Sequence, residues 1–165
     1  MLSDISLARL AQVHPELARR LHQLDAEIPS VNIQVDQGLR TWGEQNTIWL
    51  QGRKTPGPVV TNAPAGYSAH NFGYAVDVVP EDVIQRQPDW NLSHPAWQKI
   101  LAAAPGCGLA EGAKWCNAQG KPTPDNPHLY LAELPANPTD AMREQFTDGG
   151  LQAVWSNFPL EESAT

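Results

Sequence analysis

Positive charge is scarce in this 165-residue chain, which has 11 Lys and Arg against 18 Asp and Glu and a net charge of −7. Proteins that bind nucleic acid gain most of their affinity from Lys and Arg side chains that neutralise phosphates. We therefore expect no nucleic-acid partner. Residues 140–165 carry one Arg and no Lys, which also argues against a cationic tail that disrupts membranes.

Long apolar runs and a recognisable secretory signal are also missing. No segment approaches the ~18 consecutive apolar residues that a membrane-spanning helix needs. The first residues show no basic stretch followed by an apolar block. We therefore expect that the protein does not insert into a membrane. We also expect that it is made in the host cytoplasm without a signal peptide, so that any activity outside the cell requires another route across the membrane.

The chain has only two cysteines, and their spacing matches no known cysteine motif. Cys107 and Cys116 form no C-x-x-C, which argues against a redox motif or a cysteine-based zinc knuckle. In a chain without a signal peptide we expect both thiols to stay reduced. The length and the ordinary globular composition, 41% hydrophobic and 18% charged, predict one domain over residues 1–165.

Apolar spacing and turn residues predict the order of the elements. Leucines at three- and four-residue steps predict N-terminal helices over residues 5–27, with Pro15 opening the second. Thr41 and Glu44 form the capping box of a helix that ends near residue 52. Ser93 as cap and Pro95 predict a helix to about residue 104, and a last helix covers about 140–156. Strands are expected at 31–36, 72–79, within 106–115 and at 128–131, with room for a short one at 59–61.

An aspartate interrupts the most apolar of these strand patterns. Asp77 stands between Val76 and Val78, and burying a lone carboxylate there costs several kcal/mol unless a partner compensates it. His70, seven residues earlier, is of the residue type that most commonly binds metals. The segment therefore predicts a cation beside Asp77.

His128, on a later predicted strand, completes a candidate set. Two imidazoles and one carboxylate with a fourth position left open are typical of a catalytic zinc site. Asp125 would then be a base within reach of a metal-bound water without being a ligand. The chain has no H-E-x-x-H, which excludes the helical zincin arrangement. Spacing alone leaves an alternative, a strand-edge histidine and a turn-forming Asp125 before Pro127, but this alternative does not explain Asp77.

Other charged side chains are open to a plainer interpretation. Arg40 lies at a predicted strand-to-helix corner, where it either reaches into a cleft or forms a surface ion pair worth under ~1 kcal/mol. We interpret His14 and His22 as solvated residues on a helix face, and His94 as structural.

Two motifs resemble those of one enzyme family. Ser68-Ala-His70-Asn-Phe-Gly73-Tyr-Ala-Val-Asp77 matches the S-x-H-x-x-G-x-A-x-D pattern of the zinc D-Ala-D-Ala metallopeptidases, and Asp125-Asn-Pro-His128 matches their acidic-x-x-His motif. Residues 38–45 and 51–53 resemble the first conserved block of the family, so that the resemblance spans about 30–132. It implies a small α+β domain, with helices packed on a mostly antiparallel sheet and zinc in a cleft.

The resemblance also implies roles for individual residues. His70, Asp77 and His128 would hold Zn²⁺, and Asp125 would act as the general base. Arg40 resembles the arginine that helps to bind and polarise the substrate. Ser68 occupies a motif position near the ligands, where we expect a supporting hydrogen bond.

The base position distinguishes branches of this family. Carboxypeptidases and dipeptidases usually carry Glu there, whereas Asp125 is similar to the phage-type L-alanyl-D-glutamate endopeptidases. This implies a monomeric endolysin that cuts the L-Ala–D-Glu bond of peptidoglycan stem peptides and reaches the cell wall through a holin. The long loop at 117–127 departs from the family pattern and leaves the exact bond open.

Three alternatives remain beside the endolysin. The nearest is a D,D-carboxypeptidase or dipeptidase acting on D-Ala-D-Ala ends. The second is a non-catalytic zinc-bearing binding module, against which the intact Asp125 argues. The third is a serine hydrolase that uses Ser68, but residues 66–70 lack the second glycine of a nucleophile elbow.

Overall fold

A computed structural model describes residues 2–82 and 84–160, so that Met1, Val83 and the last five residues of the predicted 1–165 domain lie outside the description. Its helices are α1 Asp4–Leu10, α2 Pro15–Glu27, α3 Trp42–Leu50, α4 Pro95–Ala103 and α5 Asp140–Trp155. Its strands are β1 Ile33–Gln37, β2 Ala75–Pro80, β3 Leu109–Glu111 and β4 His128–Leu131. Short 3-10 turns lie at η1 Ala69–Phe72, η2 Ala104–Cys107 and η3 Gly112–Lys114.

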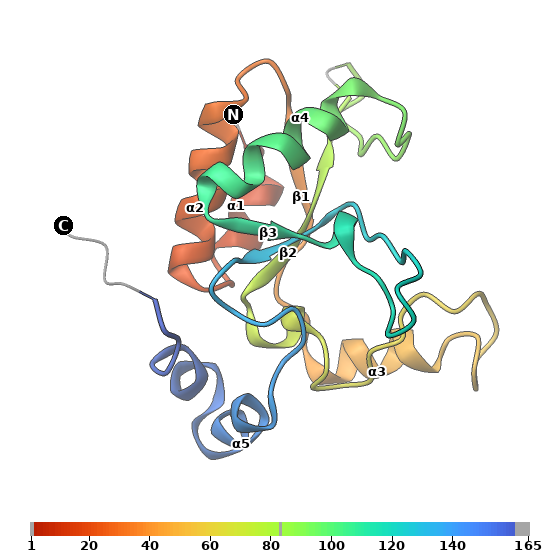
Figure 1. Ribbon diagram of the computed structural model, residues 1–165, viewed down its shortest axis with the longest axis vertical. Coiled ribbons are helices and arrows are strands. Elements are labelled where there is room, and N and C mark those ends of the chain that lie inside the picture. Colours follow the sequence, from red (N-terminus) through yellow and green to blue (C-terminus); the bar gives the residue numbers. More distant parts are fainter. Residues whose placement is uncertain (1, 83, 161–165) are drawn as a thin grey trace.

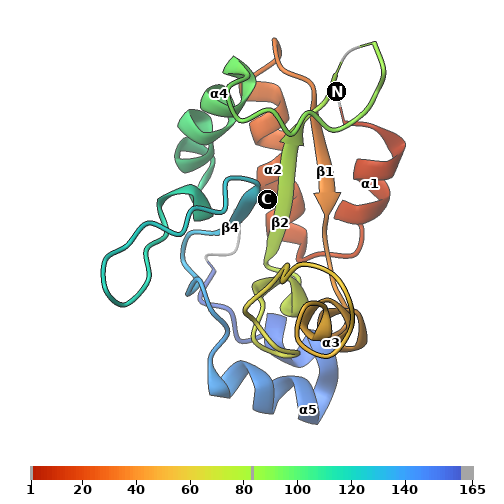
Figure 2. The same ribbon diagram turned by 90° about the vertical axis from the view of Figure 1, so that its right-hand side faces the viewer.

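The strands form one sheet in the order β1-β2-β4-β3, and every neighbouring pair is antiparallel. Helices α1, α2 and α4 surround one end of this sheet, whereas α3 and α5 lie together at the other end (Figures 1 and 2). The predicted α+β class with helices on a mostly antiparallel sheet is confirmed. No helix in residues 2–82 and 84–160 is long and apolar enough to cross a membrane.

The core joins the N-terminal helices to the central strand. Leu17, Leu21 and Leu24 of α2 are completely buried, as are Val76 and Val78 of β2. Burying one such side chain stabilises the fold by about 1.5–3 kcal/mol. The strand that carries Asp77 is therefore anchored on both sides of that residue.

Two helix starts test the predicted caps. Thr41 and Glu44 form the predicted capping box, in which Thr41 Oγ1 accepts from the Glu44 N–H at 3.2 Å and Glu44 accepts from the Thr41 N–H at 2.8 Å. The prediction of Ser93 as a cap is wrong, because His94 caps α4 and its Nδ1 accepts from the Ala96 N–H at 3.2 Å. Pro95 explains the shift, since the residue before a proline is kept out of the helical region.

His14 is structural rather than solvated. Its Nδ1 accepts a hydrogen bond from the Glu16 N–H at 3.1 Å and caps α2, and its ring lies 5.3 Å from the rings of both Trp155 and Phe158. His22, by contrast, is exposed on α2 as expected. Residues 59–61, which the structure describes in full, form no strand.

Helix α5 supports the segment between α3 and β2. Trp155 Nε1 donates to the Phe72 carbonyl at 2.8 Å, and Arg143 donates to the Gly66 carbonyl at 3.3 Å. Phe146 stacks on Trp42 of α3 with ring centroids 5.0 Å apart. The helix bends at Gly149 and Gly150, whose backbone angles are not helical. Residues 66–72 are therefore fixed from the C-terminal side of the chain.

Candidate metal centre

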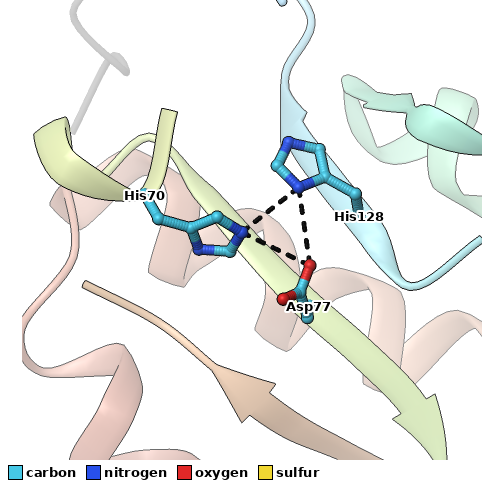
Figure 3. Close-up of side chains that lie close together, drawn as sticks. All are labelled: His70, Asp77 and His128. Atoms are coloured by element: carbon cyan, nitrogen blue, oxygen red, sulfur yellow. Dashed lines mark hydrogen bonds and ion pairs between the residues drawn. The ribbon is translucent and has the colours of Figure 1, made fainter. Parts of the chain in front are cut away.

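Sheet register brings two of the predicted ligands together. Asp77 of β2 is paired directly with His128 of β4, and residues paired in this way have neighbouring side chains on one face. His70 comes from η1, which is capped by Gly73, whose φ of 67° lies in the left-handed region that favours glycine. The three side chains point at one another (Figure 3).

The ligand atoms form a nearly equilateral triangle. His70 Nε2 lies 3.2 Å from His128 Nδ1 and 3.3 Å from Asp77 Oδ1, and His128 Nδ1 lies 3.4 Å from the same carboxylate oxygen. A tetrahedral zinc ion bound at about 2.0–2.1 Å would separate its ligands by about 3.3–3.4 Å. The donor set and its spacing therefore fit zinc.

The two imidazoles differ in what holds the side that faces away from the triangle. His70 Nδ1 lies 2.9 Å from the Gly38 carbonyl and donates to it, which leaves the Nε2 lone pair directed at the triangle. His128 turns its Nδ1 inward, and its ring lies 4.8 Å from that of Trp115. Its Nε2 is buried and has no hydrogen-bond partner among the described residues.

Charge inside the triangle keeps the carboxylate ionised. Burial alone would raise the pKa of Asp77, but without a metal ion the histidines in their protonated forms outweigh burial, His70 through its charge and both through hydrogen bonds, and hold the pKa below its usual range. A carboxylate that stays ionised at this depth is the anionic ligand that a divalent cation requires.

Asn71 joins the turn of His70 to the corner of Arg40. Its Oδ1 accepts from the Gly66 N–H at 3.0 Å, and its Nδ2 donates to the Arg40 carbonyl at 2.8 Å. The Arg40 N–H in turn donates to the His70 carbonyl at 3.0 Å. Sequence reasoning missed Asn71, although an Asn three residues after Ser68 is a signal for such local backbone bonding. Ser68 lies on the cleft wall, but its side chain makes no hydrogen bond to His70, Asp77 or His128 in the described part of the chain.

Arg40 reaches into the cleft rather than forming a surface pair. Its Nη1 donates to Gln45 Oε1 at 3.0 Å, and its Nη2 lies 3.9 Å from Asp77 Oδ2. Burial lowers the pKa of Arg40, whereas Asp77, Glu44 and Asp125 act in the opposite direction. Gln45 is completely buried and donates to the Ala63 carbonyl at 2.7 Å, which ties the guanidinium to the loop on one wall of the cleft.

Asp125 faces the same cleft from the loop before β4. Its N–H donates to the Gly112 carbonyl at 3.0 Å, and its own carbonyl accepts from the His128 N–H at 3.2 Å. A Cβ at position 112 would lie only 2.7 Å from the Asp125 carbonyl oxygen and 3.0 Å from His128 Cβ, so this site requires glycine. Burial, and then the negative charge of Asp77, raise the pKa of Asp125. A carboxyl group with a raised pKa beside a candidate metal site is suited to accepting a proton.

The cleft consists of two connected hollows. The first has a volume of about 510 Å³ and contains the ligand triangle with Arg40, Ser68 and Asp125. The second, of about 660 Å³, runs between residues 59–64 and 123–125 and shares Tyr67, Trp115 and Asp125 with the first. Together they form one groove that runs past the ligand triangle.

An α+β domain with a His-Asp-His triangle that could hold a metal ion, a nearby carboxylate and a guanidinium in one cleft is an arrangement typical of metal-dependent hydrolases. The family model described as VanY, D-alanyl-D-alanine carboxypeptidase, matches residues 10–111. The chain therefore belongs to the VanY family.

Individual relatives agree with this assignment. The peptidoglycan L-alanyl-D-glutamate endopeptidase CwlK of Bacillus subtilis is 26% identical over 133 residues, which cover 73% of this chain and 74% of CwlK. The crystal structure of the L-Ala D-Glu endopeptidase ChiX of Serratia marcescens has a TM-score of 0.53 and 25% identity, and covers 79% of this chain and 90% of ChiX. A vancomycin-resistance D,D-pentapeptidase VanY in complex with Zn(II) shares the fold, with a TM-score of 0.55 and 14% identity over 86% of this chain and 83% of VanY.

Proposed function

We propose that the chain is a zinc-dependent peptidoglycan peptidase that hydrolyses the L-Ala–D-Glu bond of stem peptides at the cell wall. The observation that carries this proposal is the triangle of His70, Asp77 and His128, whose edges of 3.2–3.4 Å match a tetrahedral zinc ion. Asp125 and Arg40 in the same cleft supply the acid–base and cationic groups that peptide hydrolysis needs.

Each residue has a distinct part in the mechanism. Zinc, when bound, would acidify a water molecule and polarise the substrate carbonyl. Asp125 takes the proton of the attacking water and later returns it to the leaving amine. Its raised pKa favours the first transfer, because the carboxylate is more basic than an exposed aspartate.

Arg40 stabilises the negative charge that develops on the carbonyl oxygen. It is held at both ends, by the Gln45 amide on its guanidinium and by its backbone bond to His70, so that little reorganisation is needed during the reaction. Ser68 lies on the cleft wall close to His70, where its hydroxyl is available to the peptide backbone.

Two observations favour the endopeptidase over the D,D-carboxypeptidase reaction. The aspartate at position 125 is the first, since carboxypeptidases of this family usually carry Glu there. The second is the similarity to CwlK and ChiX, both named as enzymes for the L-Ala–D-Glu bond. The family description keeps D-Ala-D-Ala cleavage as the second candidate.

Mass spectrometry of digested peptidoglycan decides between the two reactions. Cleavage at L-Ala–D-Glu releases peptides that begin with D-Glu, whereas a D,D-carboxypeptidase releases free D-Ala. A parallel digestion with chelator tests the metal, and restoration by added Zn²⁺ completes the test. Binding to the wall without any released product would instead indicate a binding module.

The endolysin setting is part of the same proposal. If the protein is an endolysin, bacteria that express it should lyse from within only when a holin is co-expressed, and a fall in the turbidity of the culture measures this lysis. Lysis that needs no holin would contradict this setting without affecting the bond assignment.

A further inference from the structure

Exposed apolar side chains line the groove. Val59, Val60, Tyr67 and Trp90 all contribute to its walls, and each is about half exposed, from 48% for Tyr67 to 54% for Val60. Large apolar side chains left in contact with water beside a polar site mark a surface that binds something. Trp90 has the largest of these side chains, and it is 53% exposed.

Trp90 stands on a loop whose backbone is bonded to the end of β2 at the residue before it. The loop joins β2 to α4 (Figures 1 and 2). The Asp89 N–H donates to the Pro80 carbonyl and the Asn91 N–H donates to the Asp89 side chain, both at 2.8 Å. The indole is therefore presented to the cleft from a fixed base, although its surface is free.

Trp90 and the second hollow lie on different parts of the groove. Trp90 lines only the first hollow, which holds the ligand triangle, whereas Thr123 and Pro124 line only the second. A substrate bound over the triangle therefore lies in the hollow that Trp90 lines, and a substrate that extends into the second hollow reaches Thr123 and Pro124 instead.

The proposed cleavage site places a sugar close to the triangle. In peptidoglycan the amino group of L-Ala is joined to the lactyl group of N-acetylmuramic acid, and the rest of the stem peptide follows D-Glu. One extended residue spans at most about 3.6 Å, so the sugar lies only one residue from the cleaved bond. The second hollow, which is larger in volume, has room for the remaining peptide, and the part of the first hollow beside Trp90 is left for the sugar.

We propose that Trp90 forms a sugar subsite for the N-acetylmuramic acid residue that carries the cleaved stem peptide. This inference rests on the proposed L-Ala–D-Glu cleavage. The C–H face of a pyranose ring packs on the indole, which offers a large and rigid surface at low conformational cost. The amide of Gln51 lines the same hollow and is of the chemical type that hydrogen-bonds an acetamido group.

Paired substrates test the subsite. The value of kcat/KM is measured for a muramyl stem peptide and for the same peptide without sugar, with the wild type and Trp90→Ala, Trp90→Phe and Leu92→Ala. We expect Trp90→Ala to lower the ratio of the two values about tenfold, and Trp90→Phe to retain most of it. Leu92, 57% exposed on the same loop but not on the groove, is the matched control and should leave the ratio unchanged.

A binding measurement separates this inference from the proposed function. Chelator-treated protein is sedimented with wall glycan from which the peptides have been removed, and Trp90→Ala should be retained several-fold less than the wild type or Leu92→Ala. An unchanged ratio, or equal retention of all variants, would overturn the subsite. If the wild type cuts neither substrate after L-Ala, the proposed bond is wrong, and the glycan measurement still decides whether Trp90 binds sugar.

Discussion

Removing the carboxylate of Asp125 should stop catalysis while leaving the metal centre intact. The contacts that fix this residue come from its backbone, whose N–H donates to Gly112 and whose carbonyl accepts from His128. Asp125→Ala deletes the side chain and keeps both bonds. The triangle of His70, Asp77 and His128 does not depend on that side chain, so zinc content should remain equal to that of the wild type.

The size of the loss follows from the role assigned to Asp125. General acid–base catalysis contributes about 10²–10⁴-fold to rate. Because each tenfold step corresponds to about 1.4 kcal/mol, the variant should lose about 3–6 kcal/mol of transition-state stabilisation. The loss should fall on kcat, with KM nearly unchanged, since Asp125 acts on a proton and not on the bound peptide.

Release of stem peptides from purified peptidoglycan measures the rate, and elemental analysis of the same sample measures zinc. Asp125→Asn serves as a control of similar shape that cannot accept a proton. Asp125→Glu keeps a carboxylate at this position and should therefore retain part of the activity that Asp125→Ala loses. Near-normal activity in Asp125→Ala with zinc present would refute the assignment of the base.

Three further predictions concern the ligands, the backbone and stability. His128→Ala should lose both zinc and activity, and metal analysis of the folded variant would contradict the ligand assignment if zinc were retained at full occupancy. Gly112→Ala should lower activity at least tenfold with little change in far-UV circular dichroism, because a Cβ 2.7 Å from the Asp125 carbonyl oxygen displaces the base. A wild-type rate in this variant would show that the loop accommodates the Cβ without moving Asp125. The hydrogen bond from Arg19 lowers the pKa of Glu16 to about 2; burial acts in the opposite direction, and a hydrogen bond from Arg20 lowers the pKa further. Because the pKa is lower in the folded than in the unfolded protein, the stabilisation by Glu16 is complete above pH ~4.5 and is lost as the pH falls through about 2. Urea unfolding should therefore show Glu16→Gln less stable by on the order of 2–3 kcal/mol at pH 6 and equal to the wild type near pH 2, and a difference independent of pH would contradict this account.

The sequence was informative wherever a residue conflicted with its surroundings. Asp77 between two valines predicted a buried partner, and the spacing of two motifs predicted which residues to examine. The distances could not be predicted, because His70 and His128 are 58 residues apart and meet only through the pairing of β2 with β4. Arg40 illustrates the same limit, since its choice between cleft and surface depends on the buried amide of Gln45.

Other differences come from local backbone chemistry. The N-cap of α4 is His94 rather than Ser93 because of Pro95, and β2 begins at Ala75 rather than at Phe72, which belongs to η1. Gly112 was visible only as part of a glycine-rich stretch, and its closeness to Asp125 depends on tertiary packing. Trp90 carried no pattern at all, because a single exposed tryptophan has no periodicity.

The bonds from α5 to residues 66–72 bear on how this protein can be engineered. Trp155 and Arg143 hold the carbonyls of Phe72 and Gly66, and both donors lie outside the 10–111 stretch that the family model matches. A fragment trimmed to the motifs would keep every candidate ligand but would lose the two hydrogen bonds that hold the segment around His70. A fragment meant to keep the candidate site intact should therefore extend through Phe158, which packs on His14, and fusion partners belong beyond that residue.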